Sequence, residues 1–166
     1  MTDTEPAREP DTPIAAVTPE RVAEILESEN LQYRLEDVPA PDGRQSQVMV
    51  RTGFVNVAIS FAVDEEHLTF DSMWRGTPVA EQAPKLLAAV NEWNLSQFTP
   101  TLRFFEATTG KLALSAQRQI NTTYGMSRNQ IGAFVMSTLD AVNSCFQWVE
   151  SEFPELVTWE EPHHEH

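Results

Sequence analysis

The middle of the chain alternates between large apolar residues and small or polar ones. Residues 54–63 place an apolar side chain at every second position, and residues 68–74 repeat this alternation after the acidic turn 64–66. A period of two is typical of a strand with one buried face. With two weaker extended segments, 31–35 and 47–52, the pattern predicts an antiparallel meander of three or four strands.

Apolar residues at helical spacing come before and after this region. Thr18 and Pro19 suit the N-cap and the first position of a helix that ends near Asn30. A longer apolar stripe follows Ser127 and Gln130, which form a capping-box pattern, and continues for about six turns at roughly 3.6 residues per turn. These segments predict a short N-terminal helix and a long C-terminal one.

A further helix is predicted between the two groups of strands. It covers residues 84–94, where Leu86, Leu87, Val90 and Trp93 share one face at helical spacing. Its apolar face should therefore pack against the sheet.

Two more strands are predicted after this helix, at 101–107 and 111–120, on either side of the turn 108–110. The complete order is then α-β-β-β(-β)-α-β-β-α. Hairpin-linked strands and separate helices are typical of α+β domains. We therefore expect an antiparallel β-sheet of five to six strands, with three helices packed mainly on one face.

The length of 166 residues suits one domain with tails at both ends. Residues 1–16 are acidic and rich in proline, a composition that cannot bury enough apolar surface to fold, so we expect a disordered tail. Residues 17–154 should form the domain. Residues 155–166 are expected to form an acidic tail that contains three histidines.

The formal charge of −14, from 25 acidic and 11 basic residues, disfavours two classes of partner. Nucleic acids and anionic membranes are bound mainly through clustered lysine and arginine, so neither is expected here. The chain also has no run of about 18 apolar residues and no apolar signal region near its start. We therefore expect a cytoplasmic protein.

The face of the predicted sheet that points away from the core is more apolar than a solvated face requires. Exposed apolar patches often mark partner surfaces, and methionine adapts to several ligands. The alternative is that errors of about 2–4 residues in the predicted register mix the two faces. If the face is real, it is a site for self-association or for a client peptide. Its residues are Met49, Ala58, Ala62, Met73, Phe105 and Ala113.

The end of the second helix, Asn91 to Asn94, allows two interpretations. In the functional one, the amides of Asn91 and Asn94 grip a peptide backbone beside the ring of Trp93. In the structural one, Trp93 continues the apolar face of the helix, while the asparagines end the helix or tie it to the next loop. Helical packing explains the spacing without a partner, which favours the structural interpretation.

No segment predicts a catalytic or cofactor site. His67 lies in an acidic turn without a second internal histidine, and His163, His164 and His166 lie close to the chain end, so no metal site is expected. Cys145 lies near the apolar stripe of the last helix, away from any cation that would activate its thiol. Glycine-rich phosphate loops and serine-nucleophile motifs are missing as well.

Four features in order carry a resemblance to a known family. They are the helix signature Leu86-Leu87-x-x-Val90-Asn91-x-Trp93-Asn94, the strand Leu102 to Phe105, the hairpin Gly110-Lys111-Leu112-Ala113-Leu114, and Gly125-x-Ser127 before the last helix. In this order the chain resembles the YbjN family over about residues 18–153. Each feature is weak alone, and their order carries the weight.

The resemblance implies a bacterial sensory transduction regulator whose fold is similar to that of type III secretion chaperones. Those chaperones are small acidic dimers that hold unfolded segments of their partners. The family has no assigned catalytic residues, so none are carried over to this chain. Here Leu95-Ser96-Gln97 replaces the basic residues associated with the position after the Asn-x-Trp-Asn motif, which argues against a charge-dependent role for that loop.

Three functional hypotheses follow. The first is a non-enzymatic adaptor or chaperone-like regulator that binds a protein or peptide partner and forms a homodimer. The second is a small-ligand-sensing domain with a pocket between sheet and helices, using Trp74, Trp93 or Tyr124. The third is an unrecognised enzyme, which would need at least two converging polar groups. The first agrees with both the apolar face and the resemblance.

Overall fold

The computed structural model describes residues 10–39 and 46–159, which form an α+β domain with a six-stranded antiparallel sheet. The strand order is β1-β2-β3-β4-β6-β5, so β1 and β5 are the two edges. The strands are β1 (Arg34–Val38), β2 (Gln47–Phe54), β3 (Val57–Val63), β4 (His67–Trp74), β5 (Thr101–Thr108) and β6 (Lys111–Asn121).

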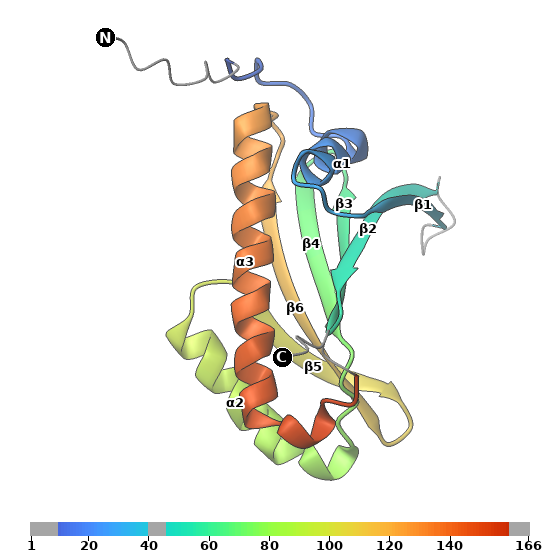
Figure 1. Cartoon of the computed structure of the whole chain (residues 1–166), viewed down its shortest axis with the longest axis vertical. Helices are drawn as coiled ribbons and strands as arrows, with labels where there is room; N and C mark the ends of the chain where they lie inside the picture. Colours follow the sequence, from blue (N-terminus) through green and yellow to red (C-terminus); the bar gives the residue numbers. More distant parts are fainter. Residues whose placement is uncertain (1–9, 40–45, 160–166) are drawn as a thin grey trace, which may run out of the picture.

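All three α-helices lie on one face of this sheet (Figure 1). The long helix α3 (Arg128–Glu152) runs along the sheet, with α1 (Pro19–Ser28) near its beginning and α2 (Ala83–Ser96) near its end. Helix α1 packs against α3, β2 and β3, whereas α2 packs against β5 and α3. The predicted fold class is therefore confirmed, and no helix formed by residues 10–39 and 46–159 lies on the other sheet face.

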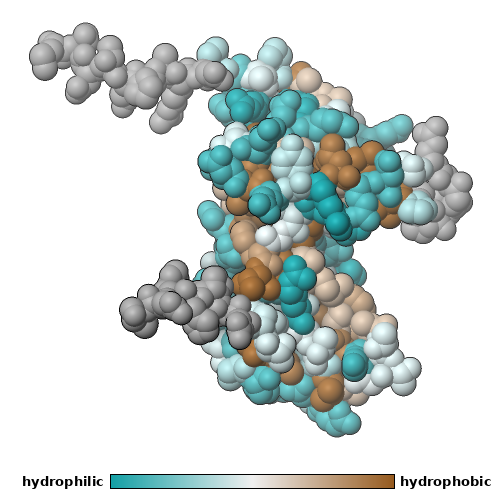
Figure 2. Space-filling view, turned by 45° about the vertical axis from the view of Figure 1, so that its right-hand side comes forward, coloured by the Kyte–Doolittle hydropathy of each residue, from teal (hydrophilic) through white to brown (hydrophobic). Residues whose placement is uncertain are grey.

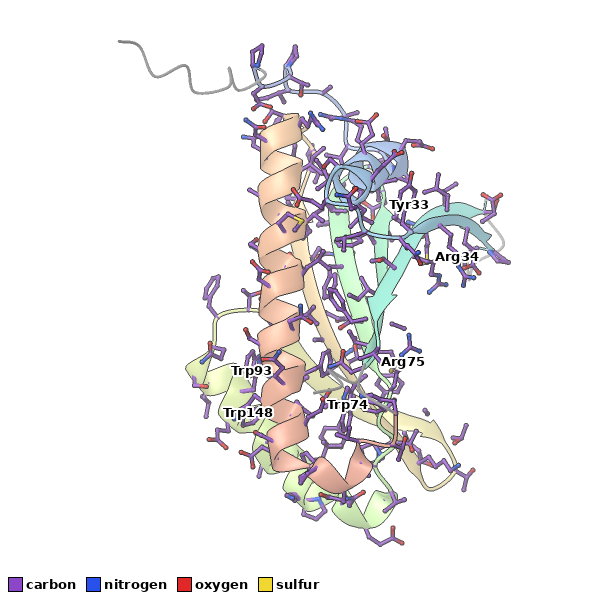
Figure 3. The ribbon with its side chains drawn as sticks, in the orientation of Figure 1. Tyr33, Arg34, Trp74, Arg75, Trp93 and Trp148 are labelled. Atoms are coloured by element: carbon purple, nitrogen blue, oxygen red, sulfur yellow. The ribbon has the colours of Figure 1, made fainter. Side chains whose placement is uncertain are left out.

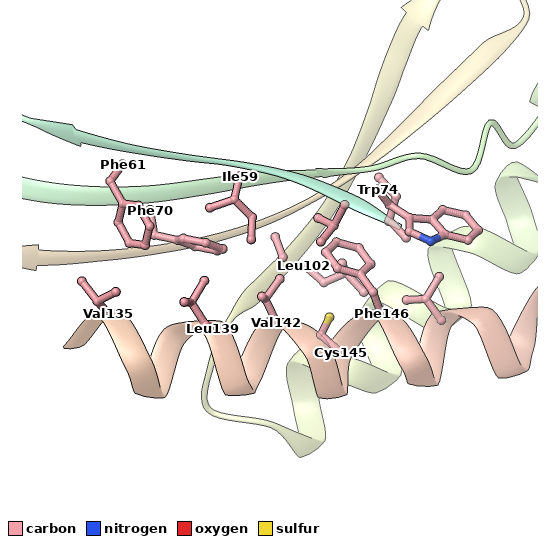
Figure 4. Packing of buried hydrophobic residues seen from close by; sticks show 14 of the residues in the cluster. Ile59, Phe61, Phe70, Trp74, Leu102, Val135, Leu139, Val142, Cys145 and Phe146 are labelled. Atoms are coloured by element: carbon pink, nitrogen blue, oxygen red, sulfur yellow. The ribbon is translucent and has the colours of Figure 1, made fainter. Parts of the chain in front are cut away.

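The core fills the space between the sheet and α3 (Figure 4). Phe61, Phe70 and Trp74 point from the strands toward the helix, and all three are buried. Val142 and Phe146 point back from α3 and are fully buried. The alternation in β3 and β4 thus places the aromatic side chains of these strands on the helix-covered face, as a period of two requires.

The predicted helix starts are confirmed in detail. Thr18 caps α1 by accepting a hydrogen bond from the backbone N–H of Arg21 at 3.2 Å. Ser127 and Gln130 form the capping box of α3, since each side chain accepts from the backbone N–H of the other. Asn30 follows the last turn of α1 with a φ of 58°, the left-handed conformation that commonly ends a helix.

One predicted strand is wrong at its start. The alternation from Phe54 to Val63 predicts a single strand, but Val55 and Asn56 form a two-residue turn between β2 and β3. Val55 is half exposed, so its apolar side chain continues the pattern without lying in the core. The first strand is also shifted, from the predicted 31–35 to β1 at Arg34–Val38.

The predicted helix 84–94 begins earlier and ends later, as α2, and follows a short 3-10 turn, η1 (Ala80–Gln82). Leu86, Val90 and Trp93 are buried as expected. Leu87 is 50% exposed, so its placement on the buried face was wrong. The apolar face of α2 that packs on the sheet is therefore narrower than the sequence suggested, because the strand that α2 mainly contacts is the edge strand β5.

Parts of both predicted tails contact the domain. The carboxylate of Asp11 accepts the backbone N–H of Asn129, and Ala15 pairs with Met126. Gly125, with a φ of 79°, permits this pairing because a Cβ atom there would lie 2.6 Å from the carbonyl oxygen of Ala15. At the other end, η2 (Pro154–Leu156) follows α3, and Leu156, Val157 and Trp159 pack against the core. Residues 1–9 and 160–166 lie outside the described residues.

Candidate functional site

The helix-free face of the sheet is the candidate site, and its side chains follow from the strand register. Directly opposed residues of antiparallel strands point to the same face. Gly53, Ala58, Met73, Ser115 and Arg103 are opposed in turn from β2 to β5 and form one row. This row, together with its neighbours, lies on the face away from α3. The predicted second face is therefore real, and the register errors considered above did not mix the two faces.

A polar row divides this face. Arg51, Ser60, Asp71 and Gln117 are opposed in sequence across β2, β3, β4 and β6. Asp71 accepts a hydrogen bond from the hydroxyl of Ser115 at 3.0 Å, so the row is tied to the next one. The apolar positions of this face are consequently split between the two sides of the polar row.

On one side, Met49 and Ala62 form an isolated apolar pair between β2 and β3. Met49 is partly buried, and the next opposed residues along its row are Thr69 and Gln119, which hydrogen-bond to each other at 2.9 Å. The predicted site residue Met49 is therefore separated from Met73 and Phe105.

On the other side lie two opposed apolar pairs, Ala58 with Met73 and Phe105 with Ala113, which we together call the Met73–Phe105 patch. Met73 is 38% exposed and Phe105 is 37% exposed. Ala113 is buried although no helix covers it, because its opposed neighbour Phe105 lies beside it. The guanidinium of Arg103 lies 5.5 Å from the ring centroid of Phe105, a cation–π distance.

Trp93 and Asn94 both have partners within the domain, although Asn94 is exposed. The indole N–H of Trp93 donates to the carbonyl oxygen of Pro100 at 2.9 Å, and its ring centroid lies 5.7 Å from that of Trp148. Figure 3 labels both tryptophans, one on α2 and the other on α3. The side chain of Asn94 accepts the backbone N–H of Leu102 at 2.9 Å and donates to its carbonyl oxygen at 2.7 Å. Asn91 is exposed. These contacts favour the structural interpretation of the motif.

Two comparisons with known proteins identify the fold family. The family model described as "YbjN: Putative bacterial sensory transduction regulator" matches residues 18–151. The chain belongs to the YbjN family. Its fold is similar to the crystal structure of YbjN from E. coli, described as "a putative transcription regulator", with a TM-score of 0.67 and 11% sequence identity. The match covers 84% of this chain and 96% of that one. A comparison with curated proteins gives no match.

In this YbjN-family chain, the Asn-x-Trp-Asn motif protects a sheet edge. The N–H and C=O of Leu102 that bind Asn94 point away from β6, at the free side of the edge strand β5. Unpaired strand edges invite pairing with other chains. The amide of Asn94 occupies the position of a neighbouring strand for one residue, so it fixes the end of α2 to the start of β5.

We expect Asn94→Ala to lower the free energy of unfolding by about 1–3 kcal/mol, because it leaves two backbone groups of Leu102 without their partner. Urea unfolding followed by circular dichroism measures this loss. Asn91→Ala, in the same helix turn and likewise exposed, removes an amide for which the described residues offer no hydrogen-bond partner; it is the matched control and should change stability by less than about 0.5 kcal/mol. Equal effects of the two substitutions would contradict the assignment of the clamp to Asn94.

The three residues of the predicted ligand pocket are not brought together. Trp74 and Trp93 are buried in the core, whereas Tyr124 is 92% exposed in the turn before α3. The indole N–H of Trp74 is used by the carboxylate of Glu150, at 3.1 Å. Core side chains fill the space between sheet and helices around these tryptophans, so the predicted pocket has no counterpart at these residues.

The structure shows what surrounds His67 and Cys145, the two internal titratable residues that the sequence analysis considered for chemistry. His67 lies 3.7 Å from Asp64, whose carboxylate also accepts two backbone N–H groups of the β3–β4 turn. Burial raises the pKa of the Cys145 thiol to about 12, so it is unreactive in the folded protein. Within residues 10–39 and 46–159, no group of His, Cys, Asp or Glu is arranged to hold a metal ion. His163, His164 and His166 lie outside the described residues.

The sequence did not point to two of the highly exposed apolar side chains. Leu95 is 89% exposed and Phe98 is fully exposed, both at the end of α2 and in the loop that follows. In the sequence, their exposure could have been inferred from the break in the apolar stripe of the helix after Trp93.

Among the helices of the described residues, none is long and apolar enough to cross a bilayer.

Proposed function

We propose that this protein is a non-enzymatic, chaperone-like regulator of the bacterial cytoplasm that binds a protein or peptide partner and forms a homodimer. The observation that carries the proposal is the helix-free sheet face with the exposed Met73–Phe105 patch. The description of the family as sensory transduction regulators supports a regulatory role.

The chemistry of the patch suits a protein partner. Met73 has an adaptable, polarisable side chain, and Phe105 offers a large apolar surface; both types are enriched at protein interfaces. Arg103 stacks beside Phe105, and arginine is the charged residue most enriched in such interfaces. The polar row beyond Met73 would form the rim of the interface, because Asp71 and Arg51 already have partners in Ser115 and Glu36 and need no desolvated contact.

The double substitution Met73→Glu with Phe105→Glu tests this proposal. Each carboxylate would be buried without a partner in the interface, at a cost on the order of several kcal/mol. We expect the wild type to have a dimeric mass and the variant a monomeric one, with dimerisation weakened by more than about 100-fold. Analytical ultracentrifugation over a range of concentrations measures both.

Leu87→Glu with Leu95→Glu is the matched control, since it adds the same two charges at exposed apolar positions of α2. It should retain the dimeric mass and also any partner captured from bacterial lysate by the wild type. Circular dichroism must show that both double variants are folded. Undiminished self-association and partner capture in the folded Met73→Glu/Phe105→Glu variant would refute the proposal.

A further inference from the structure

A groove of about 540 Å³ opens beside the edge strand β1; its lining includes Ala58 of the Met73–Phe105 patch but not Met73, Phe105 or Ala113. Its lining comes from the residues before and at the start of β1, the second half of β2, β3 and the residue after β4. Three arginines, Arg34, Arg51 and Arg75, line it, and none of the lining residues is acidic. This is unusual in a chain that has only 11 basic residues against 25 acidic ones.

The first two arginines are placed in an unfavourable arrangement. Arg34 and Arg51 are directly opposed across β1 and β2, and like charges in such positions destabilise a sheet. One carboxylate oxygen of Glu36 serves both, at 3.3 Å from Arg34 and 3.1 Å from Arg51. Glu36 does not line the groove. Within residues 10–39 and 46–159, Glu36 is the one carboxylate in ion-pair distance of these two guanidinium groups, so among these residues the trio keeps a net positive charge.

The guanidinium of the third arginine, Arg75, lies next to Gly53. An added Cβ at Gly53 would lie 3.7 Å from Nη2 of Arg75 and only 2.7 Å from the carbonyl oxygen of Val57. Nη2 of Arg75 also lies 3.5 Å from the carbonyl oxygen of Phe54, the limit of a hydrogen bond. Gly53 thus leaves the floor of the groove open and lets a third guanidinium face it.

The rest of the lining is uncharged. Tyr33 and Phe54 are partly buried against the core, and Ile59 is buried beneath them, so the groove has an apolar side next to its arginines. Figure 3 shows Tyr33 and Arg34 at the start of β1 and Arg75 beyond the end of β4. Figure 2 brings the β1 side of the molecule forward. In the upper part of that view, strongly hydrophilic residues lie next to hydrophobic ones.

From these observations we propose that the groove binds a small organic anion that carries phosphate or carboxylate groups. Guanidinium groups bind both through paired, charge-assisted hydrogen bonds. The volume lies in the usual range for small-molecule sites, about 300–1,000 Å³. A long polyanion is disfavoured because it would extend from the groove over a surface whose overall charge is −14. The proposal does not depend on the homodimer or on a protein partner.

Isothermal titration calorimetry at constant ionic strength, with inorganic pyrophosphate and with citrate as probes, tests this inference. We expect at least one probe to bind the wild type. Arg34→Gln and Arg51→Gln should each weaken that binding by about 10–100-fold, the usual effect of losing a charge-assisted hydrogen bond. A preference for pyrophosphate or for citrate would tell phosphate from carboxylate recognition.

Arg103→Gln is the matched control, because it removes the same charge from the same sheet face at the opposite edge, outside the groove. It should bind the probe as the wild type does, and so should the single substitution Phe105→Glu, which lies in the proposed dimer interface but outside the groove and so separates the two proposals. Arg34 is 74% exposed, so its substitution should leave the thermal unfolding midpoint unchanged. The inference would be overturned if neither probe bound, or if all variants bound a probe equally. It would also be overturned if the wild type bound neither small probe but bound a hexaglutamate peptide titrated in the same way.

Discussion

Phe146→Ala is expected to lower the free energy of unfolding by about 3–5 kcal/mol. Phe146 is fully buried and points from α3 toward the sheet, on the side of Leu102 and Trp74 (Figure 4). Its removal deletes the apolar contacts of a whole ring and leaves a cavity that the rigid sheet cannot close. Since domains of this size are stable by only about 5–15 kcal/mol, the loss is a large fraction of the total.

The same substitution at Phe98 is the matched control for this prediction. Phe98 is fully exposed in the loop after α2, so Phe98→Ala removes an aromatic ring without making a cavity. We expect a change of less than about 0.5 kcal/mol. Urea denaturation monitored by tryptophan fluorescence measures both variants. Similar losses for Phe98→Ala and Phe146→Ala would show that the core between α3 and the sheet is not the main source of stability.

Glu150→Ala is expected to cost about 2–4 kcal/mol, because one carboxylate oxygen serves two buried donors. Oε2 of Glu150 lies 2.7 Å from Nδ2 of Asn56 in the β2–β3 turn and 3.1 Å from Nε1 of Trp74 at the end of β4. Asn56 is 8% exposed and Trp74 is 2% exposed, so water cannot easily replace the lost acceptor. The substitution would leave both donors unsatisfied.

Two further variants make this prediction specific. Glu150→Gln keeps an acceptor oxygen but loses the charge, so we expect a smaller loss, of about 1–2 kcal/mol. Glu152→Ala removes an exposed carboxylate from the same end of α3 and should have little effect on stability. In thermal and urea unfolding, Glu150→Ala should be the least stable of the three variants, Glu150→Gln intermediate and Glu152→Ala the most stable. A loss for Glu152→Ala equal to that for Glu150→Ala would point to helix charge rather than to the shared acceptor.

Both predictions concern the attachment of α3 to the sheet, which also determines the candidate site. Because α3 runs along one face of the sheet, the opposite face is the one that we propose for partners. Glu150 ties the helix end to the β2–β3 turn, which lies directly after the groove residue Phe54. A variant that loosens this end should therefore affect the groove more than the Met73–Phe105 patch.

The elements of the fold were largely predictable because their signals are local. A capping box needs only Ser127 and Gln130, three residues apart, and the hairpin glycine Gly110 takes its positive φ within one turn. The wrong prediction that Val55 lies in a strand arose because its turn is recognised only from strand pairing, which is not a local signal. An apolar residue in a turn continues the alternation of the strand, and only the pairing of Phe54 with Val57 shows that the chain reverses there.

The candidate site was predicted less completely than the fold. The sequence correctly assigned Met73 and Phe105 to the face opposite the core, because the period of two carries that information within each strand. It could not show that the polar row separates Met49 from them, since this depends on how strands align with one another. Trp93 and Asn94 have hydrogen-bond partners 7 and 8 residues away, which no pattern within the helix reveals.

The amino-acid sequence by itself determined the order of the elements, the buried faces of β3, β4 and α3, and the membership in the YbjN family. Each of these depends on residues close together in the chain, where helical and extended periodicity are direct consequences of backbone geometry. The tertiary structure alone decided which apolar positions form one surface. It also brought Arg34, Arg51 and Arg75 around Gly53, because strand register and chain reversal join residues whose separation in sequence carries no such signal.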